Sequence, residues 1–215
     1  MRMKTRDLVS RLAQNLAPIE PNAVAKRIGR ALMQGLGTST LVLVALYGVR
    51  GDMPAMMAKP LFWLKLLFPL AIIVPALKLT ERLGQPGVPT KRAWITVLLP
   101  ILTLWMTAAI VLLFTPRGYR LELMLGSTWR VSTVNIVLLS LPPLGAAMKS
   151  MQGLAPTQLA LAGAGVGLLA GAEGVLVYTL YGVEMSVPFW GIWYVLAIGI
   201  TTIIGALLGP KLLDW

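Results

Sequence analysis

An uncharged stretch near the C-terminus limits what this chain can fold into. From Trp190 to Gly209, 20 consecutive residues contain no Asp, Glu, Lys or Arg. A helix of that length, at about 1.5 Å per residue, spans the roughly 30 Å hydrocarbon core of a bilayer. Trp193 and Tyr194 lie near one end, where aromatic side chains mark a membrane interface. The pattern predicts a transmembrane helix, in which Gly205 and Gly209 would let another helix pack closely.

The composition predicts further spans of this kind. Of the 215 residues, 57% are hydrophobic and 13% are charged, whereas about a quarter of a soluble domain is charged. Apolar stretches of helical length recur along the chain, so we expect an all-α, polytopic membrane protein built as a bundle of six transmembrane helices. The expected spans are approximately 31–49, 60–79, 94–114, 131–148, 159–180 and 190–209.

Small residues and prolines recur inside these spans. Gly163, Gly167 and Gly171 follow one another at every fourth residue, which predicts a smooth helix face for close packing. The pair Pro142-Pro143 lies inside the fourth span. Prolines are tolerated in membrane helices because neighbouring groups bind the freed carbonyls, so we interpret this pair as a kink.

Residues 1–30 form a polar arm ahead of the transmembrane domain, which we assign to residues 31–215. Apolar residues from Leu8 to Leu16 recur at helical spacing, with polar residues on the other faces, which predicts a short amphipathic helix. So short a helix is marginal in water and needs a partner surface. The residues leave two candidates open, anionic lipid and another protein.

The distribution of Lys and Arg predicts the orientation of the bundle. If the N-terminus lies in the cytoplasm, 13 of these residues fall on the cytoplasmic side and five on the other side, with Lys65 inside a span. The cytoplasmic set is Arg2, Lys4, Arg6, Arg11, Lys26, Arg27, Arg30, Lys78, Arg82, Lys91, Arg92, Lys149 and Lys211, and the opposite set is Arg50, Lys59, Arg117, Arg120 and Arg130. Because cytoplasmic loops are enriched in Lys and Arg, we expect both termini in the cytoplasm.

Two charged residues fall inside the expected spans. Glu173 lies in the middle of the fifth span, where an acidic side chain costs roughly 2.5–3.5 kcal/mol. Lys65 lies in the outer half of the second span and could reach it as an ion pair. The alternative is that Lys65 extends to the outer interface while Glu173 is buried in its neutral form.

The inventory of side chains excludes most site chemistry. Cysteine and histidine are both absent, which removes disulfides, thiol nucleophiles and the usual zinc ligands. The eight carboxylates form no acid–base pair within one segment. We therefore expect no enzymatic activity, no cofactor and no metal. The net charge of +11 is attributed to anionic lipid and orientation rather than to direct nucleic-acid binding. A small transporter or channel-like protein using Glu173 remains an alternative.

Three segments carry a resemblance to a known family. They are MKTRDLVSRLAQNLAPI at Met3–Ile19, LLSLPPL at Leu138–Leu144 followed by LAPT, and EMSVPFWGIWYVLAIG with GALLGPKLLDW at the C-terminus. In these the chain resembles the NrsF-like bacterial anti-sigma factors, negative regulators of an extracytoplasmic-function sigma factor. The resemblance implies a six-helix body that holds the sigma factor at the inner membrane until a stress signal arrives.

The resemblance also implies roles for particular residues. The sigma-binding element would be the arm helix, through Arg6, Asp7, Leu8, Arg11, Leu12 and Leu16. Family members often carry outward-facing cysteines for sensing, at positions matched here by Ser132 and Gly182, and a histidine at the position of Tyr181. Thiol sensing is therefore impossible in this chain. A remaining sensor would use loop residues such as Tyr181 and Glu184, although Glu184 could equally be a solvated loop charge.

Overall fold

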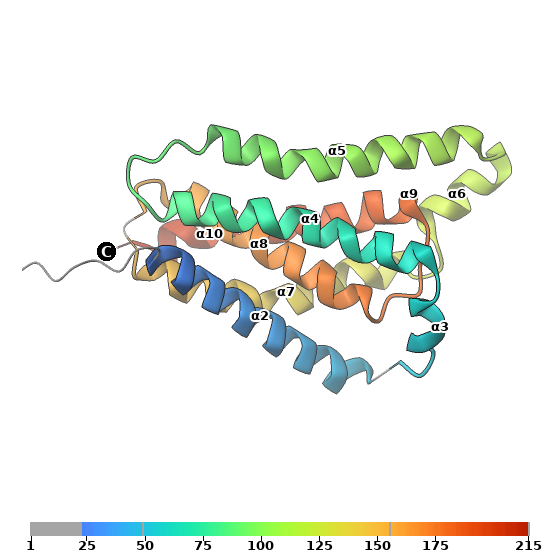
Figure 1. Cartoon of the computed structure of the whole chain (residues 1–215), viewed down its shortest axis with the longest axis horizontal. Coiled ribbons are helices and arrows are strands. Elements are labelled where there is room, and N and C mark those ends of the chain that lie inside the picture. Colours follow the sequence, from blue (N-terminus) through green and yellow to red (C-terminus); the bar gives the residue numbers. More distant parts are fainter. Residues whose placement is uncertain (1–22, 49, 155, 215) are drawn as a thin grey trace, which may run out of the picture.

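The computed structural model describes residues 23–48, 50–154 and 156–214, and within these ranges every regular element is a helix. Six helical segments are long and apolar enough to cross a membrane, as the sequence predicted. They lie side by side in an elongated bundle (Figure 1). The long helices in these segments are α2 at Ala23–Tyr47, α4 at Pro60–Leu83, α5 at Lys91–Phe114, α7 at Trp129–Gln152, α8 at Leu159–Thr179 and α10 at Val195–Leu212.

The sixth segment reaches further back than the uncharged stretch. It starts with the short helix α9 at Val187–Phe189 and the π-helical turn η1 at Trp190–Tyr194, which run directly into α10. Proline is the second residue of α9. The backbone N–H at a helix start has no partner within the helix, so proline is tolerated there. The aromatic residues expected at a membrane interface therefore lie in the π-helical turn, where Trp190 and Tyr194 are buried in the protein.

The helix α2 also starts earlier than expected, at Ala23 rather than Ala31. The added turns contain Lys26, Arg27 and Arg30, which end the apolar signal without ending the helix. Lys and Arg are good helix formers, and their long side chains can leave the membrane boundary for water.

Two short helices were not predicted, α3 at Met53–Met57 and α6 at Arg117–Leu125. Both lie at the end of the bundle opposite the C-terminus, here called the distal end (Figure 1). The end that holds the C-terminus and the start of α2 is called the proximal end. Neither short helix is long enough to give a membrane-span signal.

Helix α8 forms the centre of the bundle. It packs against α10, α7, α4 and α2, whereas α5 packs on the outside against α4 and α9. The most apolar part of α8 is 83% buried and that of α5 only 22%. Because other helices enclose α8, it is apolar on all sides and has no separate lipid-facing stripe.

The closest helix pair is α8 with α10, and glycines make it possible. A side chain on Gly163 would collide with the backbone of Gly205, and one on Gly167 with the backbone of Thr201. The converse also holds, because a side chain on Gly209 would collide with the backbone of Leu159. The predicted packing faces of both helices are confirmed, and they face each other.

The prolines inside spans leave their helices continuous, and one of them creates a bond between helices. Pro143 has no N–H, so the carbonyl of Leu139, four residues earlier in α7, loses its partner within the helix. The hydroxyl of Ser39 in α2 donates to this carbonyl at 2.5 Å, and Ser39 is fully buried. The proline thereby fixes the position of α2 against α7.

Candidate functional site

The structure gathers most of the predicted sensing residues at the distal end. Lys65, Ser132, Tyr181, Gly182 and Glu184 lie in or around the loop of residues 180–186, which joins α8 to α9. We call this segment the α8–α9 loop. The six arm residues expected to bind a sigma factor (Arg6, Asp7, Leu8, Arg11, Leu12 and Leu16) lie outside the described residues.

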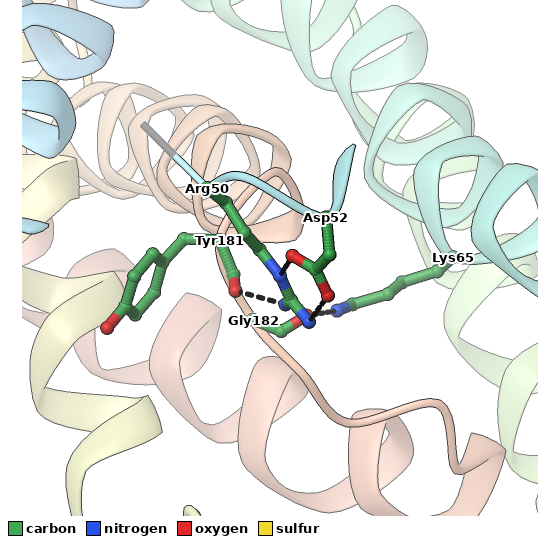
Figure 2. Close-up of polar contacts among 5 residues, drawn as sticks. All are labelled: Arg50, Asp52, Lys65, Tyr181 and Gly182. Atoms are coloured by element: carbon green, nitrogen blue, oxygen red, sulfur yellow. Dashed lines mark hydrogen bonds and ion pairs between the residues drawn. The ribbon is translucent and has the colours of Figure 1, made fainter. Parts of the chain in front are cut away.

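One side of the α8–α9 loop is held by Arg50, from the connection between α2 and α3. Its Nη1 donates to the carbonyl of Tyr181 at 2.8 Å, and its Nη2 donates to Asp52 at 2.7 Å. Figure 2 shows the guanidinium lying between the Asp52 carboxylate and this carbonyl. The hydrogen bonds from Arg50 lower the pKa of the Asp52 carboxyl. Asp52 therefore stays ionised and orients Arg50 toward the loop.

Lys65 holds the next residue of the loop. Its Nζ donates to the carbonyl of Gly182 at 2.7 Å, although Lys65 extends from α4 and is 0% exposed. The same atom lies 5.8 Å from the ring centre of Tyr194, a cation–π distance. Arg50 and Lys65 thus bind adjacent backbone carbonyls from two different elements (Figure 2).

Of the two alternatives for Lys65 and Glu173, the ion pair is wrong, because no contact forms between them. Lys65 points to the distal loop, whereas Glu173 lies six residues before the end of α8, about 9 Å deeper along the helix axis. The alternative is right only in part. Lys65 does extend toward the distal end, but it ends on a buried carbonyl rather than in water.

Glu184 joins the α8–α9 loop to the start of α7. Its Oε1 accepts hydrogen bonds from the N–H and hydroxyl of Ser127, at 2.7 and 2.6 Å, and longer ones from Thr128. These residues directly precede α7, so the carboxylate holds the turn that leads into the helix and lies near the positive end of its dipole. Burial acts to raise the pKa of Glu184, but the hydrogen bonds outweigh it and the pKa is lowered. Glu184 is therefore a bound carboxylate that ties the α8–α9 loop to the start of α7, and not a freely solvated charge.

A glycine makes room for this carboxylate. Gly126 has a φ of +58°, and a side chain there would lie 2.8 Å from the Glu184 carboxyl and from Phe189. Both its backbone conformation and the space around it therefore require glycine.

The two positions that the family resemblance associates with cysteine lie against one tyrosine. The Ser132 hydroxyl is 3.0 Å from the Tyr178 hydroxyl. A side-chain atom added to Gly182 would lie 3.1 Å from the Tyr178 ring, and also 3.1 Å from Lys65 Nζ and the Tyr194 hydroxyl. Ser132 and Gly182 are thus brought into one buried neighbourhood, which here contains hydroxyl groups instead of thiols.

Glu173 stands apart from this distal cluster. It is 0% exposed, and neither carboxyl oxygen has a hydrogen-bond partner among the described residues. A side chain on Gly35 of α2 would lie 2.6 Å from its Oε2 and equally close to Pro143 of α7. The carboxyl therefore occupies the point where α2, α7 and α8 meet. An unpaired charge is costly there, which favours the neutral carboxyl.

Sequence reasoning missed several residues of the distal cluster. Arg50 was counted only as a loop charge, and Asp52, Ser127, Thr128 and Tyr178 were not singled out. A Ser-Thr pair directly before an apolar helix is a helix-start signal, so Ser127 and Thr128 could have been found. Nothing local indicates that Tyr178 lies beside Ser132. Across the described residues, no group of three or more carboxylates, cysteines or histidines could hold a metal ion.

Comparison with known proteins assigns the chain to a family. The family model described as NrsF, negative regulator of sigma F, matches residues 12–215. The probable anti-sigma-F factor NrsF of Azospira oryzae is 37% identical over 213 residues, which cover 99% of this chain and 100% of that protein. The anti-sigma-F factor NrsF of Caulobacter vibrioides is 30% identical over 217 residues, again 99% and 100%. No solved structure matches. With six membrane-length helices and a match along nearly its whole length, this chain belongs to the NrsF family.

Proposed function

We propose that this protein is a membrane-bound anti-sigma factor. It holds an extracytoplasmic-function sigma factor at the bacterial inner membrane and releases it when an envelope or stress signal arrives. The observation that carries the proposal is the full-length match to the NrsF family, whose two relatives are named as anti-sigma-F factors. Inhibition by binding alone requires no catalytic group, because a sequestered sigma factor cannot reach RNA polymerase.

The charge distribution supports a cytoplasmic proximal end. Nine of the Lys and Arg residues counted as cytoplasmic lie in the described helices and connections of that end (Lys26, Arg27, Arg30, Lys78, Arg82, Lys91, Arg92, Lys149 and Lys211). The described part of the chain begins at this end with α2 and finishes there after α10 (Figure 1). The arm would then enter the cytoplasm, where a sigma factor is found.

The arm is the proposed binding element. Its apolar positions Leu8, Leu12 and Leu16 would enter a cleft of the sigma factor, with Arg6, Asp7 and Arg11 as polar contacts around it. Basic residues beside an apolar stripe suit a partner with acidic patches. The connection between α4 and α5 would add contacts at the same end.

The bundle supports a route for the signal. The α8–α9 loop is bonded to elements from three other parts of the distal end, and α8 runs from this loop to the point where Glu173 meets α2. The arm continues from α2. A change that loosens the distal loop would shift α8, and α8 would shift α2 and the arm.

Co-purification tests the proposal. Leu12→Glu places a charge on the apolar stripe, and Ser10→Glu places the same charge on a polar face of the same helix. We expect the sigma factor to co-purify with the wild type and with Ser10→Glu but not with Leu12→Glu, while all three proteins remain in the membrane fraction. No sigma factor with the wild type, or equal amounts with both variants, would contradict the proposal.

The unpaired carboxyl of Glu173 is the observation that favours transport, the second candidate. Membrane carboxylates without a partner often mark ion paths. The two functions respond differently to variants. An anti-sigma factor loses function when residues 1–20 are deleted, whereas a transporter keeps its activity without the arm and loses it with Glu173→Gln.

A further inference from the structure

A cavity at the proximal end lies outside the sites described above. It has a volume of about 450 Å³ and lies between the first turns of α2 and the last turns of α7. Its lining includes four cationic side chains, Lys26, Arg27, Arg30 and Lys149, and no carboxylate. All four residues are exposed. The charge of this lining favours an anion.

A buried hydroxyl in the same lining has no partner. Ser150 is 8% exposed, and its Oγ has no hydrogen-bond partner within the described part of the chain. Most other buried helix hydroxyls donate to the carbonyl four residues earlier, as Ser140 does to Ile136 at 2.7 Å and Thr179 to Val175 at 2.8 Å. Ser150 does not follow this rule, so a buried hydroxyl with an unmet hydrogen bond lies in the wall of the cavity.

One of the cations is fixed in place. Arg27 Nη1 donates to the carbonyl of Gly153, directly after α7, at 3.2 Å. A side chain on Gly153 would collide with the Arg27 guanidinium. This contact holds the two walls of the cavity together, and it sets the guanidinium near the rim before any ligand binds.

The cavity continues into an apolar groove. Gln34 lines the cavity and also a shallow groove along α2 formed with Met33, Gly37 and Leu41. Leu41 is 70% exposed, and nothing lies within 4 Å of the position a side chain would take on Gly37. The groove runs from the proximal end toward the middle of the bundle, which is the direction of a lipid acyl chain.

We propose that this cavity and groove bind one anionic phospholipid. The phosphate group lies between Arg30 and Lys149, beside Ser150 in the cavity wall, and an acyl chain lies on Met33, Gly37 and Leu41. Basic cavities between membrane helices at the cytoplasmic end bind lipid head groups in this way. The arm is a poor occupant, because residues 1–22 carry four Lys or Arg against two carboxylates and have the same sign as the cavity.

Native mass spectrometry of the full chain in neutral detergent tests the proposal. The probes are dioctanoyl phosphatidylglycerol, dioctanoyl phosphatidylcholine and glycerol 3-phosphate. We expect the phosphatidylglycerol to bind at least tenfold more tightly than either other probe, because only it combines a net negative charge with acyl chains. Equal binding of glycerol 3-phosphate would identify a site for free phosphate and overturn the proposal. Equal binding of phosphatidylcholine would also overturn it.

Variants locate the site. Each cation near an anionic lipid contributes about fivefold in affinity, so Arg30→Gln with Lys149→Gln should weaken binding about thirtyfold. The matched control, Lys91→Gln with Arg92→Gln, removes the same charge from the same end and should change binding less than twofold. Equal losses in the two double variants would mean diffuse attraction and overturn the proposal.

Two further variants separate the lipid from other occupants. Leu41→Gln should weaken lipid binding several-fold without touching the cations, and it decides the matter if the double variant does not fold. Unchanged lipid binding in Leu41→Gln would show that no acyl chain lies in the groove and would overturn the proposal. Deletion of residues 1–22 should leave lipid affinity unchanged, whereas a tenfold gain would show that the arm itself occupies the cavity.

Discussion

The carboxylate of Glu184 provides a direct test of the distal cluster. Glu184→Gln keeps the shape of the side chain and removes its charge. Its Oε1 accepts two short hydrogen bonds from Ser127, at 2.7 and 2.6 Å, and a bond to a charged acceptor is about twice as strong as a neutral one. Loss of the charge would cost about 1 kcal/mol for each short bond. Solvent at this partly exposed site reduces the total to about 1 kcal/mol.

Thermal unfolding followed by tryptophan fluorescence measures this effect. For a chain of this size, about 1 kcal/mol lowers the Tm by roughly 2–4 °C. Glu184→Ala removes all the hydrogen bonds that the side chain accepts from Ser127 and Thr128 and should cost about 2 kcal/mol. Glu122→Gln on the exposed face of α6 is the matched control, since it removes the same charge from the same end of the bundle.

The pH dependence of the difference has a defined sign. Because the folded protein lowers the pKa of Glu184, the ionised carboxylate stabilises the fold above the unfolded value of about 4.3. This stabilisation is lost as the pH falls through the lower folded pKa. The gap in Tm between wild type and Glu184→Gln should therefore be full at pH 7 and shrink below about pH 4. A gap that is absent at pH 7, equal to that of Glu122→Gln, or constant down to pH 3 would refute the reasoning.

Two further predictions concern the contacts between helices, and thermal unfolding measures both. Gly167→Ala places a methyl group against the backbone of α10 and should destabilise the bundle by about 1–3 kcal/mol. Gly199→Ala has open space and should be neutral or stabilising by up to about 1 kcal/mol; similar losses in both would show that the helices are not in close contact. Ser39→Ala removes the donor to a buried proline-freed carbonyl and should cost about 1–3 kcal/mol. Thr38→Ala, whose hydroxyl bonds only to its own helix, should cost about 0.5 kcal/mol or less, and equal costs would contradict the role of Ser39.

Both the agreements and the disagreements between the predicted and the observed helices have physical causes. The six helices were predictable because a backbone in lipid must satisfy its hydrogen bonds within each segment, so length and hydropathy are sufficient. The start of α2 was misjudged because Lys26, Arg27 and Arg30 end the apolar signal but favour a helix. The short helices α3 and α6 were missed because their lengths give no membrane signal.

The site was harder to predict than the helices. Lys65 and Glu173 were correctly recognised as charges inside spans, but their partners depend on how far each helix is shifted and rotated against its neighbours. That shift is set by contacts such as the glycine faces of α8 and α10. The sequence shows these faces without showing which register they adopt. Lys65 therefore binds the Gly182 carbonyl and not Glu173.

By itself, the sequence determined that this protein is a helical membrane bundle with glycine-lined packing faces. It also showed that most Lys and Arg residues gather in the segments predicted to be cytoplasmic. Both results follow from residue types and local spacing. Only the tertiary structure decided that Arg50, Lys65 and Glu184 converge on one loop, that Ser39 binds the carbonyl freed by Pro143, and that a basic cavity opens between α2 and α7. The physical reason is distance along the chain: these partners are tens of residues or more apart, and packing of whole helices brings them together.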